Sequence, residues 1–331
     1  MLASLGFGVY RFSVEWSRIE RRDGEVDPAG LAHYAGVLEA CRRHGIEPLP
    51  TLHHFTLPRW VAAEGGWENP STPRWFARFC GRVADAIAPL ARWIVTINEP
   101  NIAALLAYEN GVFPPAKKSS DARLRVTEAF VDAHLRTRDV LRARTDARVG
   151  LALGMADWQA VPGGEAELES IRRLREDVFL EAAAGDDFAG VNTYTRHRVG
   201  PDGFMAPEDG VERTGMGYEF WPDALAATVR RAAAATALPV FVTENGIATF
   251  DDTRRVAFVE ATLRGLHACI TDGIEVIGYL YWTTMDNYEW NYGYAPAFGL
   301  LEVDRETMER RPRPSARWLG EVARTGLLVG A

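Results

Sequence analysis

The chain has 331 residues, of which 47% are hydrophobic and 25% charged, with 45 acidic against 37 basic side chains. This composition is that of a soluble globular protein and excludes a disordered chain, a collagen and a fibrous repeat. The net charge of −8, with no basic run, makes nucleic acid and anionic membranes poor partners. The length allows one large α/β barrel or two ordinary domains.

The cysteines are few, odd in number and widely spaced: Cys41, Cys80 and Cys269. They indicate reduced intracellular thiols rather than a disulfide framework. No apolar run approaches the length of a membrane span, and the first residues lack the features of a secretory signal. We therefore expect a cytoplasmic protein.

Short apolar runs alternate with amphipathic stretches along the chain, which itself opens in MLASLG, the tail of a helix. The expected strands are Val9–Trp16, Glu47–His54, Arg92–Asn98, Val149–Met155, Phe188–Thr195, Pro239–Glu244 and Val276–Thr283. The expected helices are Ala29–His44, Pro73–Ala88, Ala122–Thr145, Glu165–Ala184, Pro222–Ala235 and Asp252–Asp272. The runs VFVT and IGYLYW are typical of strands buried on both faces. Val199–Gly217 is expected to be a long surface loop.

The alternation of strands and helices predicts a parallel sheet with right-handed crossovers, in a single domain over residues 1–331. A closed TIM (β/α)8-type barrel has eight strands, whereas seven are recognisable here. The fold class is therefore an α/β barrel with seven recognisable βα units, in which the first strand is missing.

Polar residues follow the apolar runs at the carboxyl ends of the strands, where parallel α/β folds bind ligands. They are Glu15, His53, His54, Asn98, Glu99, Asn192, Tyr194, Glu244, Asn245 and Trp282. A single carboxylate there can equally cap the next helix. Two of them, Glu99 and Glu244, each stand beside an Asn on different strands, and this repetition favours a shared site.

Two facing carboxylates are typical of glycosidic bond cleavage, in which one protonates the leaving oxygen and the other attacks the sugar or activates water. Aromatic residues near the strand ends would stack on sugar faces, although core packing is the better reading for Trp16 and Trp93. No GxSxG, HExxH, GxGxxG or P-loop motif is present. The adjacent His53 and His54 point to opposite faces of a strand, which disfavours a zinc site. We expect neither a metal nor a cofactor.

Seven segments together resemble glycoside hydrolase family 1, the β-glucosidase and β-galactosidase family. They are YRFSVEWSRIE, TLHHFTLPRW, GGWENP, TINEPN, GVNTYTR, VTENG and YWTTMDNYEWNYGYAPAFGLLEVD, and they run in family order over Val9–Trp318. The resemblance implies that Glu99 is the acid/base and Glu244 the nucleophile of a retaining enzyme. It also implies that Arg11 pairs with Glu244 and that Tyr194 donates a hydrogen bond to it, with Asn192 beside them.

The same resemblance implies a sugar-binding set. Asn98 would bind the 2-hydroxyl, His54 the 3-hydroxyl, and Glu289 with Trp290 the 3-, 4- and 6-hydroxyls. Trp282 would form the stacking floor and Phe298 would pack near the 6-position. Where Phe55, Asn101 and Tyr218 stand, the family often has Trp, and Asn101 and Tyr218 would lie on the aglycone side.

Two positions bear on specificity. The Glu289 carboxylate would repel a 6-phosphate, so we expect unphosphorylated glucosides, galactosides or fucosides as substrates. Glu rather than Gln at position 99 argues against a thioglucosidase.

The resemblance also reveals departures. The family's first strand, whose Gln binds the 3- and 4-hydroxyls, has no counterpart, and the stretch before Asn192 is short. Two alternatives therefore stand: an active retaining β-glycosidase, or a weak or inactive relative that binds sugars or serves as a scaffold. An open strand edge would be covered by another chain, such as a second copy in a homo-oligomer, or by rearranged elements of the same chain.

Overall fold

The computed structural model describes residues 1–328, and these form two compact units. Unit 1 comprises Met1–Gly8, Met155–Asp177 and the chain from Val191 onward, whereas unit 2 comprises Val9–Gly154 and Val178–Gly190. Hydrogen-bonded strands follow the order β1-β2-β3-β4-β5-β7-β8, and β6 pairs with β5. The strands are β1 Val9–Ser13, β2 Glu47–Thr51, β3 Trp93–Asn98, β4 Arg148–Ala160, β5 Phe188–Gly200, β6 Gly203–Met205, β7 Val240–Asn245 and β8 Val276–Tyr281.

Each of the seven predicted strands is present, and the prediction of seven βα-type strands is confirmed. The pairs β1–β2, β2–β3, β3–β4 and β7–β8 are parallel, as the alternation of strands and helices predicts. The chain opens in a short helix, α1 Leu2–Leu5, which matches the expected helix tail. Among residues 1–328, no helix is both long and apolar enough to cross a bilayer.

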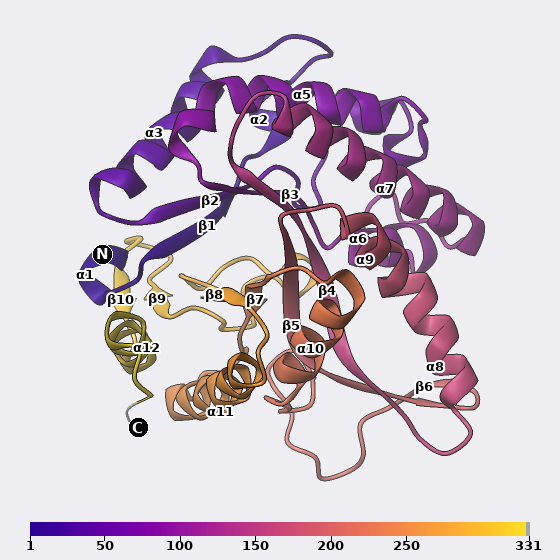
Figure 1. Cartoon of the computed structure of the whole chain (residues 1–331), viewed down its shortest axis with the longest axis vertical. Coiled ribbons are helices and arrows are strands. Elements are labelled where there is room, and N and C mark those ends of the chain that lie inside the picture. The colour runs from indigo at the N-terminus through magenta and orange to yellow at the C-terminus, as the bar shows by residue number, and fades with distance from the viewer. Residues whose placement is uncertain (329–331) are drawn as a thin grey trace. The chain divides into compact units, whose positions relative to one another are not determined.

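Three long helices of unit 2 cover its strands: α3 Pro28–Arg43, α5 Thr72–Ile87 and α7 Ser120–Arg142. They lie side by side along β1, β2 and β3 (Figure 1). Helix α3 begins where predicted, because the Asp27 side chain accepts a hydrogen bond from the amide of Ala29 at 2.9 Å and Pro28 follows it. The shorter helices of unit 2 are α2 Trp16–Ile19, α4 Arg59–Ala63, α6 Pro100–Ala104 and α9 Val178–Ala183.

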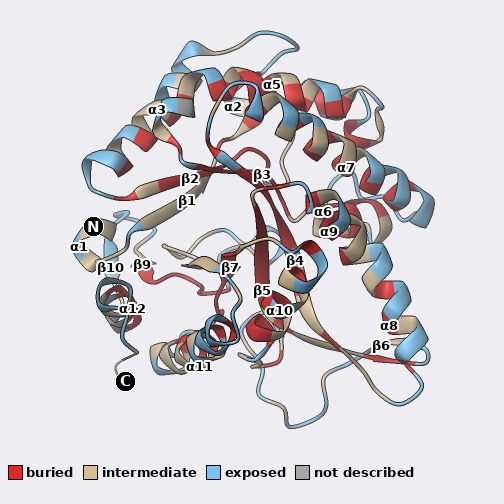
Figure 2. Cartoon of the chain, viewed as in Figure 1, coloured by how far each residue is buried: buried red, intermediate tan, exposed pale blue. Residues whose placement is uncertain are grey.

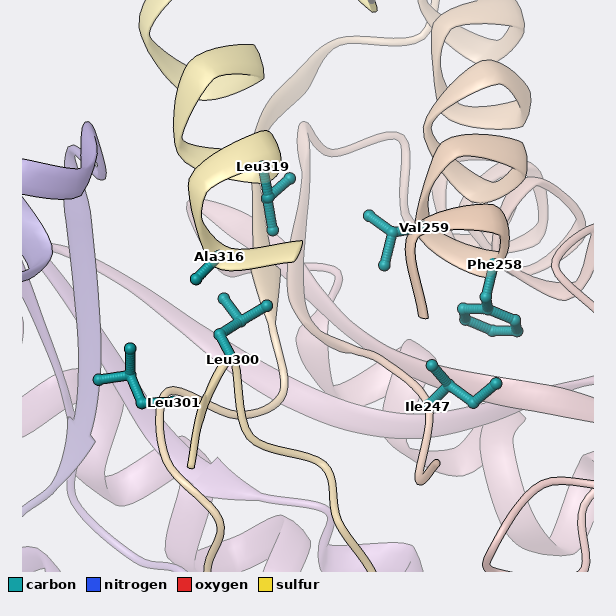
Figure 3. Close-up of a cluster of buried hydrophobic side chains, with 7 residues drawn as sticks. All are labelled: Ile247, Phe258, Val259, Leu300, Leu301, Ala316 and Leu319. Carbon is teal, nitrogen blue, oxygen red and sulfur yellow. The ribbon is translucent and has the colours of Figure 1, made fainter. Parts of the chain in front are cut away.

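Unit 1 has its own apolar cluster between α11 Asp252–Thr271 and α12 Pro314–Thr325 (Figure 3). Its buried members are Ile247, Phe258, Val259, Leu300, Leu301, Ala316 and Leu319. The unit also contains α8 Glu165–Arg172, α10 Ala224–Thr236 and the small antiparallel pair of β9 Leu301–Val303 and β10 Arg310–Pro312. Through this cluster α12 packs against the segments that follow β7 and β8.

One sequence prediction about elements is incomplete and another is wrong. The stretch Glu165–Ala184 is helical from Glu165 to Ala183, but a π-helical turn, η4 Arg173–Asp177, lies between α8 and α9. The buried Glu176 carboxylate in this turn accepts hydrogen bonds from Trp158 and Arg231, which compensate its burial. The expected loop Val199–Gly217 instead begins with a β5–β6 hairpin, whose turn needs the positive φ of Gly203.

The burial of the apolar strands also differs from the prediction at one strand. All residues of β7, which contains VFVT, are buried, as are those of β3, but every residue of β8, which contains most of IGYLYW, is only half-buried (Figure 2). The reason is that β8 ends the hydrogen-bonded path and has a strand partner on one side, in β7. The three cysteines are free and buried. Trp16 and Trp93 are core residues, as the sequence favoured.

Candidate active site

The predicted site residues fall into two groups, one on each unit, and each group is described by itself. Unit 2 carries Arg11, His54, Phe55, Asn98 and Glu99. Unit 1 carries Asn192, Tyr194, Tyr218, Glu244, Trp282, Glu289, Trp290 and Phe298.

In unit 2 the ends of three strands bring Arg11, His54 and Asn98 together. Asn98 is fully buried at the end of β3, and its Oδ1 accepts a hydrogen bond from Arg11 Nη2 at 2.5 Å. Because guanidinium nitrogens only donate, the Asn98 Nδ2 group is the one that faces His54 Nε2, at 3.2 Å. Nε2 is then an acceptor, and the ring proton lies on Nδ1, which is 3.3 Å from Ser13 Oγ. Arg11 also donates to Thr51 Oγ1 at 2.9 Å.

This network fixes the charge of His54. Burial, with a smaller effect of the nearby Arg11 cation, lowers the pKa of His54 to about 3. The imidazole is therefore neutral at physiological pH and is a hydrogen-bonding group without charge. Sequence analysis missed Ser13 and Thr51, which are polar residues at the ends of β1 and β2 and share the strand-end pattern of the residues it selected.

The expected strand Glu47–His54 ends at Thr51, so His53 lies just beyond β2, and its ring packs into a box of aromatic rings. The rings of Trp67, Phe76 and Phe130 lie 5.2 to 5.8 Å from it, centroid to centroid. Neither of its ring nitrogens has a hydrogen-bond partner among the described residues. Burial, together with the neighbouring His54, lowers the pKa of His53 to about 3. The His53 side chain is therefore part of the core packing.

The buried His53 predicts acid sensitivity of the fold. An unfolded His binds a proton below its ordinary pKa of 6.5, whereas the folded His53 does so only near 3. Its contribution to stability is complete above pH 6.5 and is lost as the pH falls toward 3. Between pH 7 and pH 5 we expect the free energy of unfolding to fall by about 2 kcal/mol from this residue.

Urea denaturation at pH 7 and pH 5 measures the effect. The variant His53→Phe keeps the ring volume, removes the titrating group and should show a pH dependence smaller by that amount. An equal pH dependence in both proteins would contradict the assignment.

Glu99 follows Asn98 in an uncommon backbone conformation, with φ 45° and ψ 54°, in the left-handed region. Its amide donates to the carbonyl oxygen of Ala152 at 2.8 Å, and its own carbonyl accepts from the amide of Ala103 at 3.0 Å. Pro100 starts helix α6 directly after it. Such a strained conformation in a non-glycine residue persists only where its surroundings hold it, and these positions cluster at functional sites.

The neighbouring strand-end residues of unit 2 have other tasks. Glu15 caps α2, since its carboxylate accepts from the amide and the hydroxyl of Ser17 and from Thr56 Oγ1. The helix-cap alternative is thus the right one for this carboxylate. Phe55 has φ 69°, and its ring lies 4.9 Å from that of His54 and 5.7 Å from that of Phe113.

In unit 1 the end of β7 holds Glu244, which is 4% exposed. The Tyr194 hydroxyl, from β5, donates to Glu244 Oε2 at 2.6 Å, so the hydrogen bond implied by the resemblance is present. Asn192 accepts from Thr243 Oγ1 at 2.6 Å, which ties β5 to β7. Gly246 follows because a side chain there would come within 2.1 Å of the Trp282 carbonyl oxygen.

A second group in unit 1 surrounds Glu289. Its Oε1 accepts from Trp282 Nε1 at 3.0 Å and from Asn287 Nδ2 at 2.7 Å, and these bonds orient the carboxylate. Trp290 is partly exposed. Asn287 was missed by sequence analysis, although it lies within the last of the seven family segments.

The remaining predicted residues of unit 1 flank these groups. Phe298 is buried, and its ring lies 5.9 Å from that of Tyr194. The Tyr218 carbonyl accepts from the amide of Thr214 at 2.8 Å. No cluster of His, Cys, Asp and Glu within residues 1–328 could hold a metal ion.

The sequence can now be compared with known proteins, with the Glu244–Tyr194 hydrogen bond and the left-handed conformation of Glu99 described. The sequence model of glycosyl hydrolase family 1 matches residues 1–197 and 187–327. The chain belongs to glycosyl hydrolase family 1. Thermostable β-glucosidase B of Thermobispora bispora is 32% identical over 98% of this chain and 78% of that protein. The β-galactosidase of Sulfolobus acidocaldarius is 29% identical over 93% of this chain and 72% of that protein.

Solved structures of this family show the same architecture. The structure of β-glycosidase BGL167 is 44% identical in sequence, and the match covers 100% of this chain and 85% of the BGL167 chain, with a TM-score of 0.92. The β-glucosidase from Thermotoga maritima in complex with glucoimidazole is 25% identical, and the match covers 99% of this chain and 85% of that chain, with a TM-score of 0.93. The predicted α/β fold of the TIM-barrel class is thereby confirmed, and the family 1 protein is a glycoside hydrolase of the β-glycosidase type.

Proposed function

We propose that this family 1 protein hydrolyses unphosphorylated β-D-glucosides, galactosides and fucosides with retention of configuration. Glu244 is the nucleophile and Glu99 the acid/base. The observation that carries the proposal is the buried Glu244 carboxylate with the Tyr194 hydroxyl 2.6 Å from its Oε2. This bond orients the buried Glu244 carboxylate, an arrangement suited to covalent catalysis.

The first displacement forms a glycosyl-enzyme. Glu244 attacks the anomeric carbon while the bond to the leaving oxygen breaks and Glu99 transfers its proton to that oxygen. In the second displacement Glu99, now a carboxylate, takes a proton from water, which attacks the same carbon and releases Glu244. Two inversions give net retention, for which the carboxyl groups should lie about 5 to 5.5 Å apart. In this proposal Arg11 pairs with Glu244, and Asn192 supports it through Thr243.

The remaining residues bind the sugar. Asn98 is assigned to the 2-hydroxyl, where hydrogen bonds strengthen in the transition state. Its Oδ1 is already occupied by Arg11, so the amide is oriented before substrate arrives. His54 is assigned to the 3-hydroxyl, Trp282 to the stacking floor, Phe298 to the 6-position and Tyr218 to the aglycone side, and Phe55 is a further substrate-binding residue. All act without a cofactor or a metal in this proposal.

The anomeric configuration of the first product tests the mechanism. Hydrolysis of 4-nitrophenyl β-D-glucoside followed by proton NMR should show β-glucose first, with α-glucose appearing only by mutarotation. The α-anomer as first product would refute the double displacement, and turnover no greater than that of Glu244→Ala on glucoside, galactoside and fucoside would favour the inactive sugar-binding alternative.

Glu289 is expected to set the preference for unphosphorylated sugars. Glu289→Ser removes hydrogen bonds to the hydroxyls, and kcat/KM for the glucoside should fall by about 10- to 100-fold, the worth of a hydrogen bond to a charged group. Hydrolysis of the 6-phosphoglucoside should rise, because the repelling carboxylate is gone. Tyr288→Phe, at the exposed neighbouring position, is the control and should leave both rates unchanged. An unaltered ratio of the two substrates in Glu289→Ser would contradict the assignment.

We further propose that the protein acts in the cytoplasm, in carbohydrate metabolism, as a homo-oligomer. The free, buried cysteines are consistent with a reducing compartment, and the half-buried β8 at the end of the strand path offers an apolar edge for a second copy. Light scattering after size exclusion tests the assembly, since a fully active monomer would count against it. Cell fractionation tests the location.

A further inference from the structure

The residue two positions after Glu99 is buried and already engaged. Asn101 is 7% exposed, and its Nδ2 donates to the carbonyl oxygen of Gly154 at 2.7 Å. Its Oδ1 is buried and has no hydrogen-bond partner among the described residues. The resemblance implied a position on the aglycone side, but here the amide is bound to the chain. A buried acceptor without a partner is costly and calls for an explanation.

Gly154, the partner of Asn101, lies against the Glu99 carboxyl group. A methyl group on Gly154 would come within 3.1 Å of Glu99 Oε1 and 2.8 Å of Ile102 Cγ1. Its φ lies outside the left-handed region, so the backbone itself would accept alanine. Glycine at position 154 therefore leaves room for the side chains of Glu99 and Ile102, and the backbone conformation of the strand does not require it.

We infer that Asn101 and Gly154 are positioning residues for the acid/base. Asn101 lies in the first turn of α6, a helix of only five residues that begins at the strained Glu99. Its hydrogen bond ties this turn to β4, beside the bond from the Glu99 amide to Ala152. The hydrogen bond from Asn101 to the Gly154 carbonyl oxygen thus keeps the Gly154 Cα next to the Glu99 carboxyl group. This inference rests on the proposed role of Glu99.

Such a role has a kinetic signature that simple damage to the fold lacks. A misplacement of about 1 Å can reduce a catalytic step by about 10²-fold. The loss must depend on the leaving group, because a sugar oxygen needs a proton as it departs whereas dinitrophenolate departs without one. The ratio kcat/KM reports all steps up to and including the first irreversible step, which here is formation of the glycosyl-enzyme. It therefore contains the acid step and excludes the later base step.

The test compares Gly154→Ala and Asn101→Leu with the unmodified protein on cellobiose and on 2,4-dinitrophenyl β-D-glucoside. We expect kcat/KM to fall by about 10²-fold on cellobiose and by no more than about 3-fold on the dinitrophenyl substrate. Gly154→Ala is the primary variant because it removes no contact. Gly81→Ala is its matched control, since it places a methyl group 3.0 Å from Val140 Cγ1 in the same unit and away from Glu99.

Each outcome decides the question. An equal loss on both substrates, or no loss on either, overturns the positioning role. Glu99→Ala, measured beside them, separates a failure of the proposed acid role of Glu99 from a failure of the positioning role. If Glu99→Ala itself shows no dependence on the leaving group, the proposed acid role has failed; if it does and Gly154→Ala does not, only the positioning inference has failed.

Discussion

Replacing Glu244 with alanine is expected to abolish hydrolysis of 4-nitrophenyl β-D-glucoside, with kcat lower by at least roughly 10⁴-fold, as when a covalent nucleophile is removed elsewhere. The reason is that no glycosyl-enzyme can form. Added azide should enter from the vacated side in a single displacement and give α-glucosyl azide, identified by NMR. The α configuration of this product identifies the lost group as the nucleophile, because azide has taken its place on the same face of the sugar.

Two comparisons sharpen this result. Tyr194→Phe removes only the 2.6 Å hydrogen bond to Glu244 and should cost about 10- to 100-fold. Glu275→Ala removes an exposed carboxylate just before β8 and should leave activity unchanged. A Glu244→Ala protein that keeps more than a tenth of the original kcat would refute the nucleophile assignment.

Glu99→Ala is expected to separate the two steps of the reaction. On cellobiose kcat/KM should fall by about 10² to 10⁴-fold, the usual contribution of a general acid. On 2,4-dinitrophenyl β-D-glucoside the first step needs no acid, so the glycosyl-enzyme should form rapidly and accumulate as a burst of dinitrophenolate. Azide needs no base to attack, and it should accelerate turnover and give β-glucosyl azide, the opposite anomer to that from Glu244→Ala.

The pair of azide products is the strongest check on which carboxylate does what. Glu39→Ala, on the exposed side of α3, serves as the control and should behave like the unmodified protein on both substrates. If Glu99→Ala gave the α-azide, or lost equal activity on both substrates, the two roles would have to be reassigned.

Much of the strand order and both carboxylates follow from local sequence patterns. The seven strands are each a short β-branched or aromatic run between helical periodicities, a pattern that needs no knowledge of long-range contacts. Glu99 and Glu244 stand out because each follows such a run beside an Asn. Glu15 also follows such a run but belongs to a helix cap, in which its carboxylate accepts hydrogen bonds from Ser17, two residues away, and from Thr56, 41 residues away.

Other features depend on segments that the sequence keeps far apart. The π-helical turn at Arg173–Asp177 contains a buried carboxylate whose partner Arg231 is 55 residues distant. The left-handed conformation of Glu99 cannot be read from the motif NEP, and the Glu99 amide bonds to Ala152 on β4. The half-burial of β8 follows from its place at the end of the strand path, although its composition matches a fully buried strand.

The sequence by itself determined the family, the strand and helix order and the two carboxylates, because those rest on local periodicity and on short motifs. Only the tertiary structure decided the state of the groups around them: the neutral tautomer of His54, set by Arg11 through Asn98, and the tether from Asn101 to Gly154. Charge and orientation in a buried site depend on which polar atoms meet there, and those atoms come from residues 40 to 90 positions apart.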